Sequence, residues 1–218
     1  QVWNQYDEHY YIKRTPASNT SIGIADQLNS NNEIFLLRYW DSFVYDEDEL
    51  DWSEDPFDDW TWQFYYHSLR MVSYLINAHE LTGDTVYLEK AKWFIESWIE
   101  HNPSPSNQSS ERAWDDHSTA NRITTFIYFW DHYRNSQIFD EEFANEFLNM
   151  LRKHGEYTAK KANYFWGHNH GIYQDRALIQ LAVLFPVFES SEEWLEIAVS
   201  RLSIHLETSV TPTGVHKE

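Results

Sequence analysis

The sequence has no cysteine, only six glycines and no run of apolar residues long enough to cross a membrane. The absence of cysteine excludes disulfides and thiol chemistry. A membrane helix needs about 20 predominantly apolar residues in succession, so the pattern indicates no membrane partner. The chain begins with Gln1 and shows no signal peptide, which indicates a processed chain or a fragment. A cysteine-free chain is compatible with a secreted or periplasmic bacterial protein, and we predict that location.

Positive charge is also scarce. Lys and Arg total 16 against 35 Asp and Glu, which gives a net charge of −19. Proteins that bind nucleic acids present a basic surface, so the composition excludes nucleic acid as a partner and argues against anionic membrane surfaces. A polyanionic substrate would need a local positive patch within this negative surface. The charge balance also argues against heavily sulfated chains.

Aromatic residues are abundant, at 17% of the chain with eleven tryptophans. This is too aromatic for a disordered chain. A packed core accounts for most of these side chains. The others could line a cleft in which sugar rings stack on indole and phenol faces. A length of 218 residues indicates one domain, or part of a larger one.

Helical periodicity begins at Thr61 and continues almost to the end of the chain. The predicted helices start at capping residues and end at helix breakers. They run from Thr61 to Gly83, from Asp84 to Pro103, from Asp115 or Asp116 to about Asn135, from Asp140 to about Asn163, from the stretch 166–175 to Phe185, and from a capping box formed by Ser190 and Glu193 to about Ser209.

Three successive antiparallel helical hairpins therefore form residues 61–218, and the predicted fold class is all-α. Such an array fits a solenoid or an α/α toroid, and the absence of a repeated sequence period disfavours the solenoid. Residues 1–60 read as an irregular segment. Its acidic run, Tyr45–Trp60, is expected to be a solvated loop, as dense charge runs usually are. Calcium binding is a weaker alternative, because the run lacks the spacing of an EF-hand.

The stretch WGHNHGIYQD, positions 166–175, holds two of the six glycines and two histidines around an asparagine. Asn169 could cap the helix that follows. His168 and His170 could bind a metal, although the sequence shows no clear third ligand. The third reading is catalytic, because an amide and an imidazole would emerge together at a helix N-terminus, whose dipole favours an anion.

β-Elimination beside a carboxylate requires such a pair of groups. The C5 proton of a uronic acid is barely acidic while the neighbouring carboxylate is charged. An amide donor and a cation that hold the carboxylate stabilise the enolate-like state that develops there. A His or Tyr can then remove the proton, and a Tyr or His can protonate the departing glycosidic oxygen.

Three segments together resemble heparinase II/III-type polysaccharide lyases: Asp58–Pro103, Trp114–Arg122 and the Asn-His motif Asn169–Gly171, which alginate lyases of similar fold share. The resemblance covers roughly residues 52–218. It implies an incomplete α/α toroid with a long cleft and no cofactor or metal. It also implies an acidic polysaccharide substrate that contains uronic acid, such as a heparan-like glycosaminoglycan or alginate, and cleavage by β-elimination.

By this resemblance, Asn169 would neutralise the substrate carboxylate, with His170 beside it as the second catalytic residue. Gln174 follows Asn169 by about a turn and could orient it, while Arg122 could instead form a surface ion pair with Asp115 or Asp116. The predicted substrate-binding residues are Trp114, His117, Arg122, Trp166 and Gln174.

The segment Gly214–Glu218 matches the opening of the family's Gly-x-x-x-Glu motif, which precedes the catalytic tyrosine. The tyrosine, the later helices and the C-terminal β-sandwich of such lyases do not follow. We therefore expect a truncated toroid from a longer enzyme, inactive or nearly so by itself. A glycoside hydrolase or uronyl epimerase on a similar toroid is an alternative, and a hydrolase would need two facing carboxylic acids. A non-catalytic glycan-binding module would keep Trp114 and Trp166 without needing an Asn-His pair.

Overall fold

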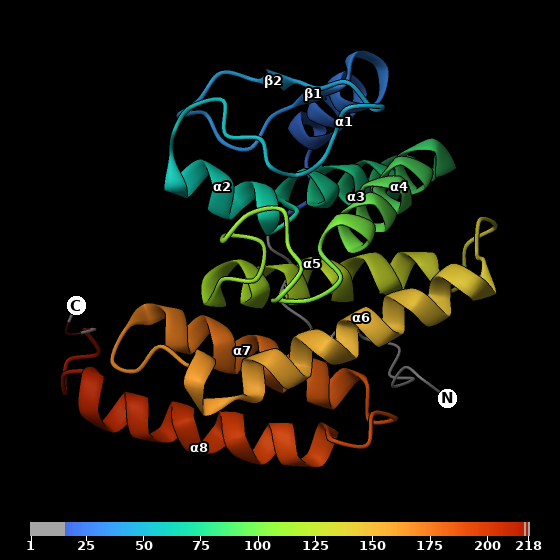
Figure 1. The fold of residues 1–218 in the computed structure, drawn as a ribbon. Helices are drawn as coiled ribbons and strands as arrows, with labels where there is room; N and C mark the ends of the chain where they lie inside the picture. Colours follow the sequence, from blue (N-terminus) through green and yellow to red (C-terminus); the bar gives the residue numbers. More distant parts are fainter. Residues whose placement is uncertain (1–15, 216, 218) are drawn as a thin grey trace.

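The structure is a computed structural model that describes residues 16–215 and residue 217. Most of this part of the chain is helical (Figure 1). The helices are α1 Asn19–Asn31, α2 Trp60–His67, α3 Arg70–Thr82, α4 Thr85–His101, α5 Asp116–Tyr133, α6 Glu141–Ala159, α7 Asn169–Leu184 and α8 Ser191–Ser209, with a 3-10 turn, η1, at Lys161–Asn163. Two short strands, β1 Glu33–Ile34 and β2 Phe43–Val44, pair antiparallel. None of the helices described is long and apolar enough to span a membrane.

The three predicted hairpins are confirmed. Helices α3 and α4, α5 and α6, and α7 and α8 pack against each other in pairs. The first members of the pairs, α3, α5 and α7, also contact one another in order, as do the second members, α4, α6 and α8. The helices therefore form two layers, one made of α3, α5 and α7 and the other of α4, α6 and α8 (Figure 1). It confirms the all-α prediction and matches an incomplete α/α toroid.

The predicted helix caps are confirmed at three positions and wrong in detail at the fourth. The carboxylates of Asp84, Asp115 and Asp140 each accept a hydrogen bond from a backbone N–H two or three residues ahead. Ser190 does precede α8, but its side chain makes no capping hydrogen bond. Its backbone, at φ −89° and ψ 4°, lacks the extended conformation of a capping residue, so the predicted capping box does not form.

The first predicted helix is divided into α2 and α3. Leu69, fully buried, adopts a left-handed backbone with φ 55° and breaks the helix. The carbonyls of His67 and Ser68 at the end of α2 accept hydrogen bonds from Arg122 at 2.6 Å and from Thr125 at 3.2 Å. Both donors lie on α5. The break is stabilised by contacts distant in sequence, which is why hydrophobic periodicity did not show it.

The prediction that residues 1–60 are irregular is wrong for α1. This helix packs against α3 and buries Ala25 and Leu28. The acidic run after β2 is a series of turns, as expected, but it is only partly solvated. Tyr45 and Trp52 turn inward and are buried in the core. The chain before α2 therefore covers the helical layers and contributes to the same core.

A buried guanidinium lies at the centre of the core. Arg122 of α5 has no exposed surface, and its guanidinium carbon is 3.7 Å from the centre of the Trp98 ring. Its Nε donates to Nε2 of His154 at 2.8 Å, while Nδ1 of His154 donates to the carbonyl of Met150. Burial and the charge of Arg122 lower the pKa of His154, and they lower the pKa of His67 to about 3. Both imidazoles are therefore neutral, and one cation links α2, α4, α5 and α6.

Replacing this cation with an apolar side chain should destabilise the fold strongly. The substitution Arg122→Met leaves the carbonyl of His67 and Nε2 of His154 buried without their donor. An unsatisfied buried acceptor costs about 1–3 kcal/mol, so we expect a loss of about 3 kcal/mol in the free energy of unfolding, measured with urea. Arg152→Met on α6, where the side chain is partly exposed and pairs with Glu156, is the control and should cost little. A loss at Arg122 no larger than at Arg152 would contradict this account of the core.

Candidate functional site

The loop between α6 and α7 is tied to the first turns of α7. The buried Tyr164 donates its hydroxyl hydrogen to Oδ2 of Asp175 at 2.7 Å. The side-chain oxygen of Gln174 accepts from the backbone N–H of Phe165, and its amide nitrogen donates to the carbonyl of Asn163 at 2.7 Å. Gln174 is buried and committed to the loop. Its predicted contact with substrate is therefore not seen, and it positions the loop instead.

Glycine is required at the two positions of this stretch for different structural reasons. Gly167 has φ +71°, a left-handed turn that most side chains disfavour. A side chain at Gly171 would place its Cβ only 2.7 Å from the carbonyl oxygen of Phe165 and 2.9 Å from the hydroxyl of Tyr164. The first glycine turns the loop, and the second lets the loop lie directly on α7.

Helix α7 begins at the Asn-His pair. His168 occupies the capping position, and its Nδ1 accepts a hydrogen bond of 3.3 Å from the backbone N–H of His170. The capping role considered for Asn169 thus belongs to His168. Asn169 is the first helical residue and is partly exposed. Its amide lies in the first turn, where the helix dipole and backbone N–H groups favour a negatively charged ligand.

Side chains from three helices meet beside this turn. Nδ1 of His170 lies 3.0 Å from Oδ2 of Asp116, the first residue of α5. The ring of His117 lies 4.1 Å from that of His170 and 4.2 Å from that of Phe64 on α2. The ring of Tyr173 lies 4.9 Å from His117 on the α7 side. The structure therefore brings His117 to the Asn-His pair, as predicted from positions more than fifty residues apart in sequence.

The contact with Asp116 defines what His170 can do. A carboxylate that accepts from Nδ1–H leaves Nε2 as the proton acceptor of the neutral ring, and it stabilises the ring when that ring gains a proton. In the sequence, Asp116 reads as a possible helix cap or as one partner of a surface ion pair, and its contact with His170 was not predicted. Its position next to His117, within the segment that resembles the lyases, was the signal available.

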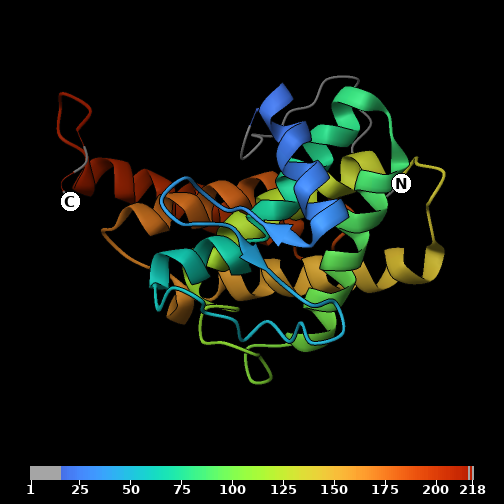
Figure 2. The same cartoon turned by 90° about the horizontal axis from the view of Figure 1, so that it is seen from above.

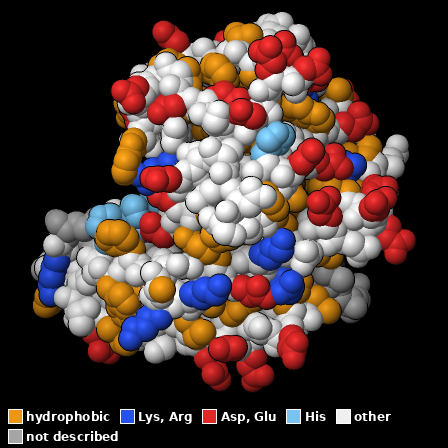
Figure 3. All heavy atoms as spheres, viewed as in Figure 1, with side chains coloured by type: hydrophobic (Ala, Val, Ile, Leu, Met, Phe, Trp, Pro, Cys, Tyr) orange, Lys and Arg blue, Asp and Glu red, His pale blue; other side chains and the backbone are white. Residues whose placement is uncertain are grey.

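Aromatic side chains border this cluster and face solvent. Phe165 and Trp166 are 48% and 47% exposed. The ring of Trp166 stands edge-on against Tyr164, with 4.6 Å between centroids, and keeps a face that a sugar could stack on. The molecule is hollowed at the left edge of Figure 3, between α2 and the start of α7, and histidine side chains lie on the lower rim of this recess.

Two of the predicted substrate-binding residues lie elsewhere. Trp114 is 2% exposed, and its indole N–H donates to the carbonyl of Asn102 at 3.1 Å. Arg122 is the buried cation of the core. Neither side chain offers surface to a sugar in this structure. The alternative ion pair of Arg122 with Asp115 is also absent, because Asp115 pairs with Arg112 at 2.6 Å.

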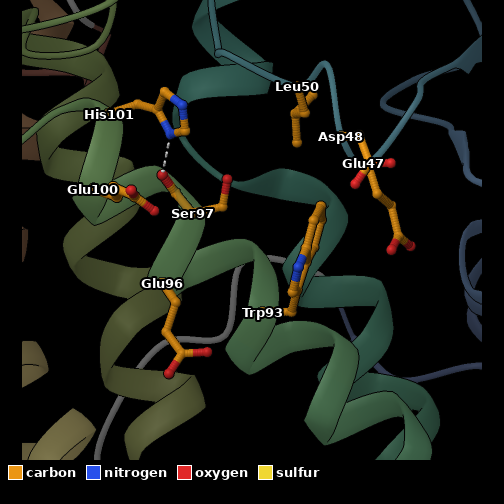
Figure 4. A pocket seen from close by; sticks show the side chains of 8 residues that line it. All are labelled: Glu47, Asp48, Leu50, Trp93, Glu96, Ser97, Glu100 and His101. Carbon is orange, nitrogen blue, oxygen red and sulfur yellow. Dashed lines mark hydrogen bonds between the residues drawn. The ribbon is translucent and has the colours of Figure 1, made fainter.

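A second pocket, of about 350 Å³, opens between α4 and the loop after β2 (Figure 4). Its lining residues are Glu47, Asp48, Leu50, Trp93, Glu96, Ser97, Glu100 and His101. Carboxylates on both walls would repel an acidic polymer. Within the residues that the structure describes, no three or more His, Asp or Glu side chains are grouped so as to hold a metal ion. The recess at α2, α5 and α7 is therefore the candidate site for an acidic polysaccharide.

Asp175 lies beneath this site as a buried acid. Burial raises its pKa to about 7, although the hydrogen bond from Tyr164 and the positive charge of Arg201 both act to lower it. Its Oδ1 has no hydrogen-bond partner among the described residues.

The elevated pKa predicts a pH-dependent stability. The folded chain holds the Asp175 proton more tightly than the unfolded chain, so stability falls as pH rises from about 4 to about 7. Asp175→Asn keeps an acceptor for Tyr164 and removes the charge. The melting temperature of the variant relative to the parent should therefore be higher at pH 8 than at pH 4.5. Asp58→Asn, on an exposed turn with φ 48°, is the control. The same difference at both pH values would contradict the burial of a titrating acid.

The chain is similar to two curated heparin-sulfate lyases. The lyase of Bacteroides thetaiotaomicron is 22% identical over 231 residues, which cover 96% of this chain and 32% of the relative. The lyase of Pedobacter heparinus is 23% identical over 177 residues, which cover 81% of this chain and 26% of the relative. The chain thus spans at most about a third of the length of these relatives.

Solved structures share the fold. A heparan sulfate lyase HepC mutant from Pedobacter heparinus superposes with a TM-score of 0.81 at 22% identity, over 96% of this chain and 32% of that chain. A crystal structure of heparinase III gives a TM-score of 0.82 at 18% identity, over 96% and 34%. Residues 6–218 match the Heparinase II/III N-terminus family. With that match over nearly its whole length, the chain belongs to the heparinase II/III family.

Proposed function

We propose that the protein containing this chain is a glycosaminoglycan lyase that cleaves a heparan-sulfate-type polysaccharide by β-elimination. The observation that carries the proposal is the Asn169–His170 pair at the start of α7, with His170 held by Asp116 at 3.0 Å. Family membership and the names of the curated relatives support the same reaction class.

Asn169 is assigned to the substrate carboxylate. In the elimination, the C5–H bond breaks, its electron pair forms the C4–C5 double bond, and the bond from C4 to the glycosidic oxygen breaks. Negative charge spreads onto the carboxylate as the proton leaves. An amide donor that is already in place, at the positive end of a helix, stabilises that charge without reorganising.

His170 is assigned to the proton. Its Nε2 is the proton acceptor of the neutral ring when Asp116 accepts from Nδ1–H, and the carboxylate stabilises the imidazolium that forms. His117 lies against His170, and Phe64 lies against His117, so the base is fixed within a wall of rings. The departing oxygen takes a proton from a second group, for which the family resemblance implies a tyrosine.

The other readings have less support. A hydrolase would need two carboxylic acids facing each other across a sugar, yet Asp116 is engaged with His170 and Asp175 is buried. A binding module would not require the contact between Asp116 and His170. The curated relatives favour a glycosaminoglycan over alginate. Secretion or export to the periplasm fits the proposal, because a polymer of this size is met outside the cytoplasm.

Asn169→Ala tests the proposal. In the full natural protein that contains this chain, the loss of one preorganised donor should lower turnover by roughly a hundredfold or more. Binding should weaken less, because Trp166 and His117 remain. The readout is the ultraviolet absorbance of the unsaturated uronate, which hydrolysis does not produce, on heparan sulfate and on alginate.

Asn145→Ala is the matched control, since Asn145 is exposed and lies on α6, away from the start of α7 in the sequence. It should retain parental turnover. Release of saturated sugars alone would establish a hydrolase, and the absence of any product would favour the binding module. Full turnover in Asn169→Ala would remove the role assigned to the amide.

A further inference from the structure

A second cluster of arginine and aromatic side chains is connected to the candidate site through the rings of Phe64 and Tyr65. We call Arg38, Tyr39, Tyr65 and Arg70 the outer patch. Tyr39 is 72% exposed, and the guanidinium carbon of Arg38 lies 5.6 Å from the centre of its ring. Arg70 is placed between two rings, 5.3 Å from Tyr65 and 5.7 Å from Tyr74. The patch thus presents two cations on aromatic surfaces.

The charges of the outer patch are notable in a chain with a net charge of −19. Arg38 and Arg70 form no ion pair with any carboxylate that the structure describes. Nε of Arg70 donates to the carbonyl of Leu36 at 2.9 Å, which fixes the guanidinium while its other nitrogens make no hydrogen bond to a described residue. Other basic residues in the described part of the chain do pair with carboxylates, among them Lys90, Lys92, Arg112, Arg134 and Arg152.

A fixed guanidinium without a carboxylate partner is suited to bind an anion from outside. Arginine presents a planar set of N–H donors that matches carboxylate and sulfate oxygens. A pocket of about 430 Å³ opens beside the patch, with Arg38, Tyr39 and Tyr74 among its lining residues. Its other side chains are mainly apolar or carry hydroxyl groups. The chemistry fits a sugar ring that bears an acidic group.

Aromatic contacts connect the outer patch with the candidate site. The ring of Tyr65 lies 4.6 Å from that of Phe64, which lies 4.2 Å from His117, which lies 4.1 Å from His170. The loop between β1 and β2, which carries Arg38 and Tyr39, extends toward the side where α2 and the start of α7 lie (Figure 2). Trp40 of this loop also contacts Tyr65, with 6.3 Å between ring centroids.

We propose that the outer patch is a separate subsite for the acidic polysaccharide, where Arg38 and Arg70 bind the carboxylate or sulfate of a sugar several units from the one held by Asn169. The inference rests on the proposed function. It extends that function by making long chains better ligands than short ones. The polymer would follow the run of rings from the recess at α7 to the loop between β1 and β2.

Calorimetric titration of the 218-residue chain with size-defined heparan sulfate oligosaccharides tests the subsite. The parent should bind a dodecasaccharide more tightly than a tetrasaccharide. Arg38→Gln and Arg70→Gln should each weaken dodecasaccharide binding by roughly five- to tenfold, as for a charged hydrogen bond that is partly screened by solvent. Binding of the tetrasaccharide should not change. Arg38→Gln is informative even if Arg70→Gln disturbs folding, because the side chain of Arg38 is exposed.

Arg152→Gln removes the same charge from α6 and should leave the affinities for both oligosaccharides unchanged. Equal affinity of the parent for both lengths, or unchanged dodecasaccharide binding in Arg38→Gln, would overturn the subsite. Equal weakening of both oligosaccharides would also overturn it, because the arginines would then act at the central site. None of these results bears on the formation of unsaturated product, so the proposed function stands or falls separately.

Discussion

The buried guanidinium of Arg122 is the interaction on which the arrangement of the helices depends. A charge without solvent is costly unless every donor finds an acceptor, and here the acceptors are the neutral His154 and the carbonyl of His67. The second contact ends α2 and allows α3 to start in a new direction. Because α2 is stopped there, Phe64 faces the start of α5, and the ring wall of the candidate site is assembled.

The candidate site is supported by a second group of buried polar side chains, which join the loop after α6 to α7. Tyr164, Asp175 and Gln174 tie the loop after α6 to α7, and Gly171 permits the close approach. These contacts fix the start of α7, which carries Asn169 and His170. The side chain of His170 is held in addition by Asp116 and His117 of α5. The buried hydrogen bonds of Tyr164, Asp175 and Gln174 lie directly beneath the proposed chemistry, where a satisfied polar network favours a single geometry.

Much of the site was visible in the sequence as residue types, but not as contacts. The Asn-His pair, the two glycines and the His117 segment were identified from spacing and family resemblance. Trp114 and Arg122 belong to the same resembling segment, yet both point inward. Arg122 lies on the face of α5 that packing covers, and Trp114, in the turn before α5, donates its indole N–H to the carbonyl of Asn102. Asp116 was missed because its partner, His170, lies 54 positions away.

The sequence alone determined the helices and their order in hairpins, because apolar periodicity and capping carboxylates act within a few residues. It also determined the acidic character of the chain and the presence of an amide and an imidazole at one helix start. Only the tertiary structure decided where α2 breaks, that α1 joins the core, and which side chains of α5 face the recess. Those outcomes depend on hydrogen bonds and burial between residues far apart in the chain, such as Arg122 with His67, which no local pattern of residues encodes.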